Sequence, residues 1–345
     1  MMKKKIAVLF GGNSAEYTVS LQSASAVCSH IDMEKYTIIP IGITRQGDWF
    51  RYYGDFENIL SDTWHHDTNH CIPVVVLPNR SVRGIIELTK DGNKLTRLDA
   101  AFPILHGKNG EDGTIQGLFE LAGIALIGCG TLCSALCMDK DRAHRLVQAA
   151  GIAVPQSVVI EQPTALALAK QLKYPLFVKP VRAGSSFGIT KINQQEDLHA
   201  AVKHAFEYDR QVIIEENIDG FEVGCAILGN DSLTIGRVDE IQLTHGFFDF
   251  TEKYTLKSSK IHMPARIDWP TEKRIQKTAE IIYRVLDCSG FARVDMFLTP
   301  TKEIIFNEVN TIPGFTSHSR YPNMMKGIGI SFSELLDKLI DQCEI

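Results

Sequence analysis

Long apolar runs are missing from this sequence, and so is any concentration of basic residues. No stretch approaches the roughly 20 apolar residues that a membrane-spanning helix needs, and the longest basic run is Lys3 to Lys5. The net charge of -5 over 345 residues does not indicate the basic surface that nucleic acids attract. The opening MMKKKIAVLFGG has only five apolar residues between its lysines and its glycines, which is too short for a signal peptide. We therefore expect a cytoplasmic protein that binds neither nucleic acid nor membrane.

The chain also lacks any CxxC pair, although it contains eight cysteines. Cys129, Cys133 and Cys137 follow one another at a spacing of four residues and would share one face of a helix. No histidine lies beside them at ligand spacing, so the pattern indicates small, reduced, apolar side chains rather than a metal site.

The length of the chain predicts two or three domains, because one hydrophobic core rarely extends over so many residues. The first 130 residues alternate strand-like and helix-like segments, which favours a parallel sheet with helices on both faces. Residues 47–96 contain short strand candidates broken by Gly, Asn, Pro and Asp, as in an inserted antiparallel ribbon. We predict an N-terminal α/β domain over residues 1–128, a central α+β lobe over residues 129–220 and a C-terminal domain over residues 221–345.

Residues 290–319 carry the most informative motif, GFARVDMFLTPTKEIIFNEVNTIPGFTSHS. Its pattern predicts two short strands joined by a turn, with Arg293 and Asp295 on the first strand and Glu308 and Asn310 on the second. Residues two apart in a strand point to the same face. Three oxygen-bearing side chains on facing strands suit a hard cation that bridges phosphate oxygens. The alternative is a surface hairpin with ordinary charges.

A glycine-rich segment lies between two strand-like stretches in PLFVKPVRAGSSFGITK, residues 175–191. It lacks the spacing and the following helix of a Walker A loop, and it is typical instead of a flap whose backbone N–H groups cover phosphates. Glycine-serine turns between strands are also common in proteins that bind nothing. Lys179 favours the phosphate interpretation, because a lysine in an apolar strand is costly to bury unless an anion meets it.

Three other segments leave alternatives open. FGGNSAEYTVSLQSA lacks the GxGxxG fingerprint of dinucleotide sites, and its Glu16 is either a partner of a helix dipole or the receiver of a substrate ammonium. In LHGKNGEDGTIQG, Glu111 and Asp112 either cap the next helix or help to shape a binding site. The irregular segment THGFFDFTEKYTLKSSKIH, residues 244–262, is either part of an active-site lid near residues 244–263 or a surface excursion.

In this order along the chain, the motifs resemble those of the D-alanine:D-alanine ligases of the ATP-grasp superfamily. The resemblance extends over nearly the whole chain and rests on GGNSAEYTVS, LHGKNGEDGTIQG, ALCMDKDRAH, FVKPVRAGSSFGITK, FDFTEKY, RVDMF and FNEVNTIPGFTSHSRYP. The long ribbon and the run KYTLKSSKIHMPARI are most similar to the VanG-type D-alanine:D-serine ligases of glycopeptide resistance. The resemblance implies an ATP-grasp fold with a parallel α/β N-terminal domain, a central nucleotide-binding lobe, a C-terminal domain for metal and substrate, and a homodimer.

The resemblance also implies which side chains hold the nucleotide. Lys140 and Lys179 would contact the ATP phosphates, and Lys253 of the lid would contact the γ-phosphate. Glu215 would hold the adenine edge, and Glu222 the ribose hydroxyls. Glu216 stands where many relatives carry a lysine, so its contact stays open. Asp295, Glu308 and Asn310 match the ligands of two Mg2+ ions, which Mn2+ can replace.

For the amino acids, the resemblance implies that Glu16 holds the ammonium group of the first D-alanine, with Ser185 and Tyr254 linked to it by hydrogen bonds. Ser319 would take the carboxylate of the second substrate. The oxyanion that forms when the amine attacks needs preplaced donors. Arg293 and the backbone N–H of Gly314 are our candidates for them.

Phe248 and Arg320 bear on the choice of the second substrate. The D-alanine:D-alanine ligases tend to carry leucine or methionine at the second position and often tyrosine at the first. A guanidinium offers fixed donors to a hydroxyl or a carboxylate, and these donors are poorly paired when alanine enters. Relatives that use D-lactate also carry arginine, but they usually lack the pair formed here by Lys253 and Tyr254. The alternative for Arg320 is a surface salt bridge.

We therefore expect an ATP-dependent ligase that joins D-alanine to D-serine through a D-alanyl phosphate, in cell-wall precursor synthesis and vancomycin-type glycopeptide resistance. Metal ions and lysines would neutralise the moving phosphoryl group. A D-alanine:D-alanine ligase with the same mechanism is the nearest alternative. A non-catalytic nucleotide-binding module and a nicotinamide-dependent oxidoreductase remain as alternatives of other classes, and the missing GxGxxG disfavours the second of these.

Overall fold

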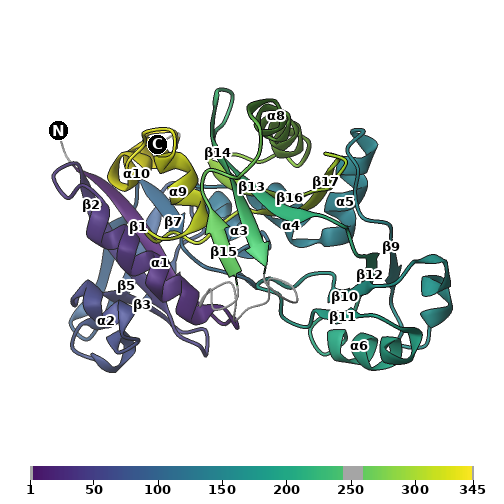
Figure 1. Cartoon of the computed structure of the whole chain (residues 1–345). Coiled ribbons are helices and arrows are strands. Elements are labelled where there is room, and N and C mark those ends of the chain that lie inside the picture. The colour runs from purple at the N-terminus through teal and green to yellow at the C-terminus, as the bar shows by residue number, and fades with distance from the viewer. Residues whose placement is uncertain (1–2, 244–258, 344–345) are drawn as a thin grey trace.

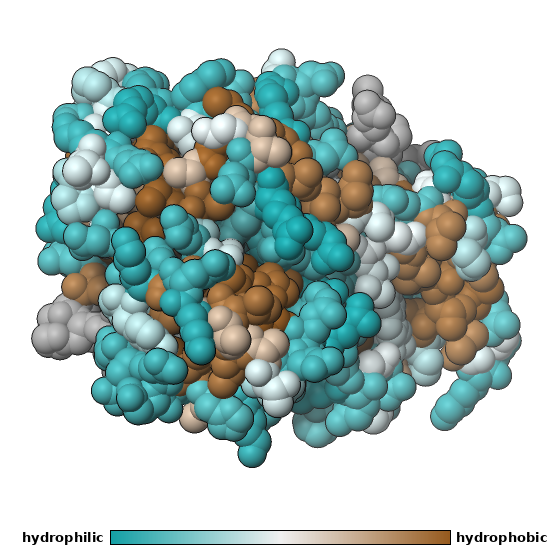
Figure 2. All heavy atoms as spheres, turned by 90° about the vertical axis from the view of Figure 1, so that its right-hand side faces the viewer, coloured by the Kyte–Doolittle hydropathy of each residue, from teal (hydrophilic) through white to brown (hydrophobic). Residues whose placement is uncertain are grey.

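The computed structural model describes residues 3–243 and 259–343, and within them the chain forms a row of three β-sheets with helices packed against them (Figure 1). Phe248, Lys253 and Tyr254 of the expected lid lie outside the described residues. None of the described helices is both long and apolar enough to cross a membrane. Figure 2 views the molecule from the side of the central lobe, where apolar surface occurs in patches among hydrophilic side chains.

The N-terminal sheet confirms the strand-helix alternation and the antiparallel ribbon. Its strands are β1 (Lys4–Gly11), β2 (Tyr36–Ile43), β3 (Trp49–Tyr52), β4 (Cys71–Val76), β5 (Gly84–Thr89), β6 (Gly92–Arg97), β7 (Ala100–Pro103) and β8 (Ala125–Leu126). They lie in the order β6-β5-β4-β3-β2-β1-β7-β8. β1 pairs in parallel with β2 and β7, whereas β2 to β6 pair in antiparallel fashion. The helices of this region are α1 (Tyr17–His30), α2 (Phe56–Leu60), the 3-10 turn η1 (Trp64–His66) and α3 (Thr114–Ala122).

The central lobe is a four-stranded antiparallel sheet with one α-helix. Its elements are β9 (Ser157–Ile160), η2 (Leu166–Gln171), β10 (Leu176–Pro180), β11 (Thr190–Ile192), η3 (Gln195–Asp197), α6 (Leu198–Ala205) and β12 (Val212–Glu216). The strand order is β11-β10-β12-β9. This arrangement places the glycine-rich segment between β10 and β11, so the segment connects two neighbouring antiparallel strands.

The C-terminal sheet contains the predicted hairpin. Its strands are β13 (Phe221–Gly229), β14 (Leu233–Leu243), β15 (Ser259–His262), β16 (Phe291–Leu298) and β17 (Ile304–Asn310), in the order β15-β14-β13-β16-β17. The helices around it are α4 (Thr131–Met138), α5 (Lys140–Ala149), α8 (Trp269–Val285), α9 (Arg320–Lys326) and α10 (Phe332–Asp341).

The end of the chain packs on its beginning. One buried cluster includes Phe10 of β1 and Leu21 of α1 together with Tyr321 of α9 and Leu336 of α10, and Figure 1 shows α9 and α10 beside the N-terminal sheet. The C-terminal helices therefore fix the N-terminal sheet against the C-terminal sheet. The expected domain boundaries at residues 128 and 220 stay a prediction.

Candidate active site

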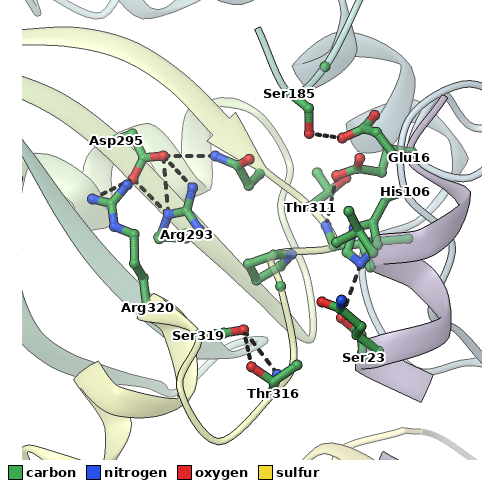
Figure 3. Close-up of a pocket in the computed structure, with 18 of the residues that line it drawn as sticks. Glu16, Ser23, His106, Ser185, Arg293, Asp295, Thr311, Thr316, Ser319 and Arg320 are labelled. Carbon is green, nitrogen blue, oxygen red and sulfur yellow. Dashed lines mark hydrogen bonds and ion pairs between the residues drawn. The ribbon is translucent and has the colours of Figure 1, made fainter. Parts of the chain in front are cut away.

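The hairpin of β16 and β17 brings the expected metal ligands together. Asp295 lies opposite Glu308 in the register of the two strands, and Arg293 lies opposite Asn310. Asp295 is only 1% exposed. Its carboxylate accepts hydrogen bonds from Arg293 Nε (2.8 Å) and Nη2 (2.6 Å) and from Asn310 Nδ2 (2.9 Å), as Figure 3 shows. Two acids, one amide and one guanidinium are thus concentrated at one end of the hairpin.

Arg320, the first residue of α9, adds a second guanidinium to this acidic site. Its Nε and Nη2 donate to the two carboxylate oxygens of Asp239 at 2.7 and 2.8 Å. Its Nη1 donates to Glu222 Oε1 at 2.8 Å, and Nη2 lies 3.4 Å from Asp295 Oδ1. Arg320 is only 8% exposed, so the surface salt bridge that we considered for it is wrong. Burial opposes its charge, but Asp239 and Asp295 outweigh that effect and raise the pKa of Arg320.

A missing side chain makes room for this ion-pair cluster. Gly224 on β13 lies between Asp239 of β14 and Asp295 of β16 in the strand register. A Cβ atom at this position would lie 2.4 Å from Arg320 Nη2 and 2.7 Å from Asp239 Oδ1, distances that real Cβ atoms do not adopt. Sequence analysis missed Asp239, because the VDE pattern of its strand does not show which distant arginine faces it.

Glu16 approaches the same cavity from the N-terminal sheet. It occupies the N-cap position of α1, but its side chain makes no capping hydrogen bond; instead it accepts a hydrogen bond from the Ser185 hydroxyl (Figure 3). A Cβ atom at Gly107 or Gly184 would lie 2.2 or 2.8 Å from Glu16 Oε2. Two glycine-containing loops therefore close around this carboxylate at the cavity wall, and its role toward a substrate ammonium stays a prediction.

The two acids in the loop before α3, Asp112 and Glu111, have different surroundings. Asp112 accepts hydrogen bonds from the backbone N–H groups of Asn109 and Thr114. Glu111 instead lines the cavity and accepts from the backbone N–H groups of Gly107 and Ile312. Burial, and then the nearby Glu16, raise the pKa of Glu111 to about 8.

His106 in the same loop is a cavity residue that sequence analysis missed. Its Nε2 lies 3.4 Å from Ser23 Oγ (Figure 3). Burial lowers its pKa to about 4, so the imidazole is neutral near pH 7. The LHG sequence marked this loop as a candidate site without distinguishing its histidine from its charged residues.

A second cavity lies under the glycine-rich segment. Lys179 Nζ donates to Glu215 Oε2 at 2.6 Å across the pair of β10 and β12. The anion that meets this buried lysine is a protein carboxylate, so its burial does not by itself indicate a phosphate, and the contact of Lys179 with phosphates stays a prediction. The Glu215 Oε1 atom is buried without a hydrogen-bond partner among the described residues. Burial raises the pKa of Glu215, but Lys179, His144 and Lys140 together outweigh this effect and lower it below its usual value.

Among the described residues, the other nucleotide candidates Lys140, Glu216 and Glu222 also line this second cavity. Lys140 Nζ donates to the Ala183 carbonyl at 2.7 Å. Glu216 accepts from the backbone N–H of Lys173 at 2.8 Å, so at least one of its oxygens supports the lobe itself. Ser185 and Ser186 adopt positive φ angles of 46° and 62°, which gives the glycine-rich segment a sharp bend over the cavity.

The two cavities have volumes of about 600 and 550 Å3 and meet below the glycine-rich segment. The first is lined by the expected residues Glu16, Ser185, Arg293, Asp295, Asn310, Gly314, Ser319 and Arg320. The second is lined by Lys179, Glu215 and Glu216. Residues that line both are Lys140, Ala183, Gly184, Ser185, Glu222 and Glu308. A group passed from one cavity to the other would cross beside Glu308 and Lys140.

The donor atoms fit ATP and divalent cations. Asp295, Glu308 and Asn310 offer the hard oxygen ligands that Mg2+ prefers. Asn310 now turns its Nδ2 toward Asp295, and a rotation of its amide would present Oδ1 to a cation instead. The unpartnered Glu215 Oε1 is an acceptor suited to an amino group such as that of adenine, because a buried acceptor without a partner is unfavourable.

Comparison with known proteins identifies the family. Residues 5–129 match the D-ala D-ala ligase N-terminus and residues 146–341 the D-ala D-ala ligase C-terminus. The vancomycin B-type resistance protein VanB of Enterococcus faecalis is 45% identical over 99% of this chain and 98% of its own. The D-alanine--D-alanine ligase of Caldicellulosiruptor bescii is 42% identical over 99% of this chain and 95% of its own.

Solved structures agree with the sequence matches. The crystal structure of the VanG D-Ala:D-Ser ligase from Enterococcus faecalis has a TM-score of 0.92 and 64% identity, with 99% of each chain covered. The D-alanine-D-alanine ligase from Coxiella burnetii has a TM-score of 0.87 and 31% identity, with 99% of this chain and 94% of that chain covered. The chain therefore belongs to the D-Ala-D-Ala ligase family and is an ATP-dependent ligase with the ATP-grasp fold that acts on small amino acid substrates.

Proposed function

We propose that this ligase joins D-alanine to D-serine through a D-alanyl phosphate, and that the dipeptide enters cell-wall precursors that confer resistance to vancomycin-type glycopeptides. The likeness to the VanG D-Ala:D-Ser ligase supports this substrate pair. Relatives that carry other names, including D-alanine--D-alanine ligases, are similar over the same length, so the family alone does not select the second substrate.

One N–H group of Arg320 carries the proposal. A guanidinium has five N–H donors, and four of them face the carboxylates of Asp239, Asp295 and Glu222. The fifth, on Nη1, has no protein partner among the described residues. A D-serine hydroxyl accepts such a donor, whereas the methyl group of D-alanine does not. The carboxylates of Asp239 and Glu222 fix the plane of the guanidinium, so this donor has a defined direction.

The other residues have roles that follow from their positions. ATP supplies the phosphoryl group that activates the D-alanine carboxylate, and Mg2+ neutralises its charge. Glu16, held by Ser185, would bind the ammonium group of the first substrate. Ser319 would bind the carboxylate of the second, since its hydroxyl lies at the cavity wall beside Thr316. Arg293 and the N–H of Gly314 would stabilise the oxyanion, while Lys140 and Lys179 would contact phosphates.

A D-alanine:D-alanine ligase is the second candidate, and one observation favours it. Because carboxylates already satisfy most of the guanidinium of Arg320, an apolar substrate leaves only one donor unpaired. The cost of accepting D-alanine is then that of one charged hydrogen bond, about 1.5–3 kcal/mol. Such a cost corresponds to roughly a 10- to 100-fold preference and not to complete exclusion.

The experiment that decides is product analysis from mixed substrates. The protein is incubated with ATP, Mg2+ and equal concentrations of D-alanine and D-serine, and mass spectrometry identifies the dipeptides. We expect D-alanyl-D-serine to predominate. Predominance of D-alanyl-D-alanine would assign the second candidate, and absence of both dipeptides would refute the substrate pair. A homodimer remains part of the proposal, to be tested by sedimentation.

A further inference from the structure

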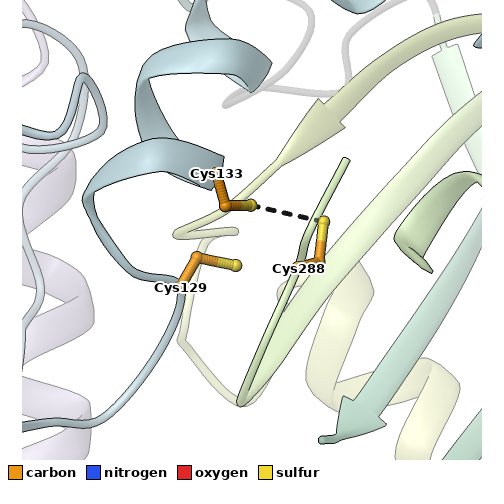
Figure 4. Close-up of side chains that lie close together, drawn as sticks. All are labelled: Cys129, Cys133 and Cys288. Carbon is orange, nitrogen blue, oxygen red and sulfur yellow. Dashed lines mark hydrogen bonds between the residues drawn. The ribbon is translucent and has the colours of Figure 1, made fainter. Parts of the chain in front are cut away.

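Two neighbouring cysteines at the start of α4 and a third that is distant in sequence bring their sulfur atoms together. Cys129 precedes this helix, Cys133 lies in its first turn, and Cys288 follows α8 (Figure 4). The Sγ atoms of Cys133 and Cys288 are 3.4 Å apart, and all three Sγ atoms lie within 4.8 Å of one another. We call these three residues the thiol cluster. Cys137, whose Sγ lies 3.8 Å from that of Cys133, is the next sulfur.

The thiol cluster lies at the margin of a hydrophobic core. Cys129 and Cys133 are buried, with Cys133 1% exposed, whereas Cys288 is half-buried and gives access from the surface. Among residues 3–243 and 259–343 this is the only group of three metal-ligating side chains whose ligand atoms converge in this way. It is separate from the two cavities that we assign to the reaction, because none of its three members lines either cavity.

The spacing of the sulfur atoms suits a thiolate-bound cation. A zinc–sulfur bond is about 2.3 Å long, so sulfur atoms around one cation are roughly 3.8 to 4.0 Å apart. Packed thiols have similar separations, so spacing alone does not decide. The stronger observation is that a loop from 155 residues away adds a third thiol to two on the α4 segment. The sequence did not predict this cluster, because the chain has no CxxC pair and because the contact between α4 and Cys288 depends on tertiary packing.

We propose that Cys129, Cys133 and Cys288 bind one thiophilic cation with a filled d shell, of the class of Zn2+ and Cd2+. Soft thiolate ligands select such cations over Mg2+. Each thiol that becomes a ligand loses its proton to solvent, so three metal–sulfur bonds form as three S–H bonds break, and the bound divalent site carries one negative charge. The fourth position is filled by water.

Proton release makes cation affinity depend on pH. Each ligand thiol must release its proton before it binds the cation, so affinity rises as pH rises. The bound cation would tie the loop after α8 to α4, which leads through Asp139 to Lys140 at the edge of both cavities.

The test is a titration of the reduced, chelator-treated, full-length protein with Cd2+ alone, in the absence of oxygen. Thiolate-to-cadmium charge transfer absorbs in the ultraviolet, and we expect this absorption to saturate at one equivalent and to disappear when Zn2+ is added. Cys133→Ala should lose at least tenfold in affinity. The matched control is Cys225→Ala, because Cys225 is equally buried in the same core but lies on β13; this variant should bind as the unaltered protein does.

Folding is controlled separately. Cys288→Ala alters a half-buried residue at the end of a helix, and it should also lose the absorption while keeping the far-ultraviolet circular dichroism of the unaltered protein. Added Zn2+ should raise the melting temperature of the unaltered protein and of Cys225→Ala but not that of Cys288→Ala. Absence of saturable absorption at one equivalent, or full absorption retained in both Cys133→Ala and Cys288→Ala, would overturn the proposal.

Discussion

The two cavities differ in how completely their charged side chains are paired. In the first, the charged groups are paired with one another: Arg293 with Asp295, and Arg320 with Asp239. In the second, Lys179 is paired with Glu215, but one oxygen of that glutamate has no partner among the described residues. The first cavity is thus arranged before a substrate enters, whereas the second leaves an acceptor for the nucleotide to complete. Preorganised groups favour selection between small substrates, and an unfilled acceptor favours affinity.

The largest effect on turnover should come from Asp295→Asn, because Asp295 lies between the guanidinium groups of Arg293 and Arg320. This substitution removes a carboxylate that we assign to Mg2+ and leaves Arg293 and Arg320 with less negative charge to face. We expect phosphate release that depends on D-amino acids to fall about 10³-fold, because metal stabilisation of the moving phosphoryl group accounts for several kcal/mol.

Glu303→Gln is the matched control for that change. Glu303 is exposed at the turn of the same hairpin, and its substitution should leave turnover unchanged. If Asp295→Asn keeps more than a tenth of the turnover while remaining folded, the assignment of the hairpin to a metal is wrong.

Arg320→Leu should change both stability and preference. It leaves Asp239 as a buried carboxylate without its ion pair, which typically costs about 3–5 kcal/mol in the free energy of unfolding. It also removes the donor that we assign to the serine hydroxyl, so the ratio of kcat/KM for D-serine to that for D-alanine should fall about 10- to 100-fold. Urea unfolding and steady-state kinetics with each second substrate measure the two effects.

A second variant separates these two effects. Arg320→Leu combined with Asp239→Asn no longer buries an unpaired charge, so it should recover part of the stability without recovering the D-serine preference. A ratio of kcat/KM that returns with stability would show that Arg320 acts only through folding. An unchanged ratio in the single variant would place the determinant at another residue.

The sequence predicted the hairpin and the closeness of its polar side chains well, because their relation is local. Residues two apart in a strand share a face, and the turn at residues 299–303 brings the two strands together. The partners of Arg320 and Lys179 were not predictable in this way, since Asp239 and Glu215 reach them through strand registers set by distant packing. The same limit applies to Cys288, whose contact with Cys133 depends on where α8 ends. Local pattern thus identified the motifs, and tertiary contacts determined which charges meet.

Glu215→Gln tests the incomplete pairing of the second cavity. The amide keeps an acceptor but loses the charge that pairs with Lys179, so we expect KM for ATP to rise about tenfold with a smaller change in kcat. Glu216→Gln is the control on the same strand, and it should have less effect because Glu216 accepts from the backbone of Lys173. Equal effects of the two substitutions on KM would contradict the role assigned to the buried oxygen.

The smallest effect concerns Glu111, an acid of the first cavity that accepts hydrogen bonds from two backbone N–H groups. The pKa of Glu111 is raised to about 8 by burial and by Glu16, so between pH 4.5 and 8 the native protein keeps a proton that the unfolded chain has lost. The free energy of unfolding should therefore decrease as pH rises through this window. His106 acts in the opposite direction only below pH 6.5, because its native pKa is lowered to about 4.

Between pH 6.5 and 8, without nucleotide or Mg2+, the comparison of variants isolates Glu111, because the other titrating groups contribute equally to each variant. Glu111→Gln should lessen the decline in the free energy of unfolding by at most about 1.4 kcal/mol per pH unit, the value for one proton. Asp112→Asn, in the same loop, should leave the decline as it is. If the two variants show the same slope as the unaltered protein, Glu111 is ionised in the native state, and the first cavity then compensates its charges completely. That outcome would make the contrast with the second cavity sharper, because Glu111, like Asp239 and Asp295, would be stabilised as a carboxylate before a substrate enters, whereas Glu215 Oε1 lacks a partner among the described residues.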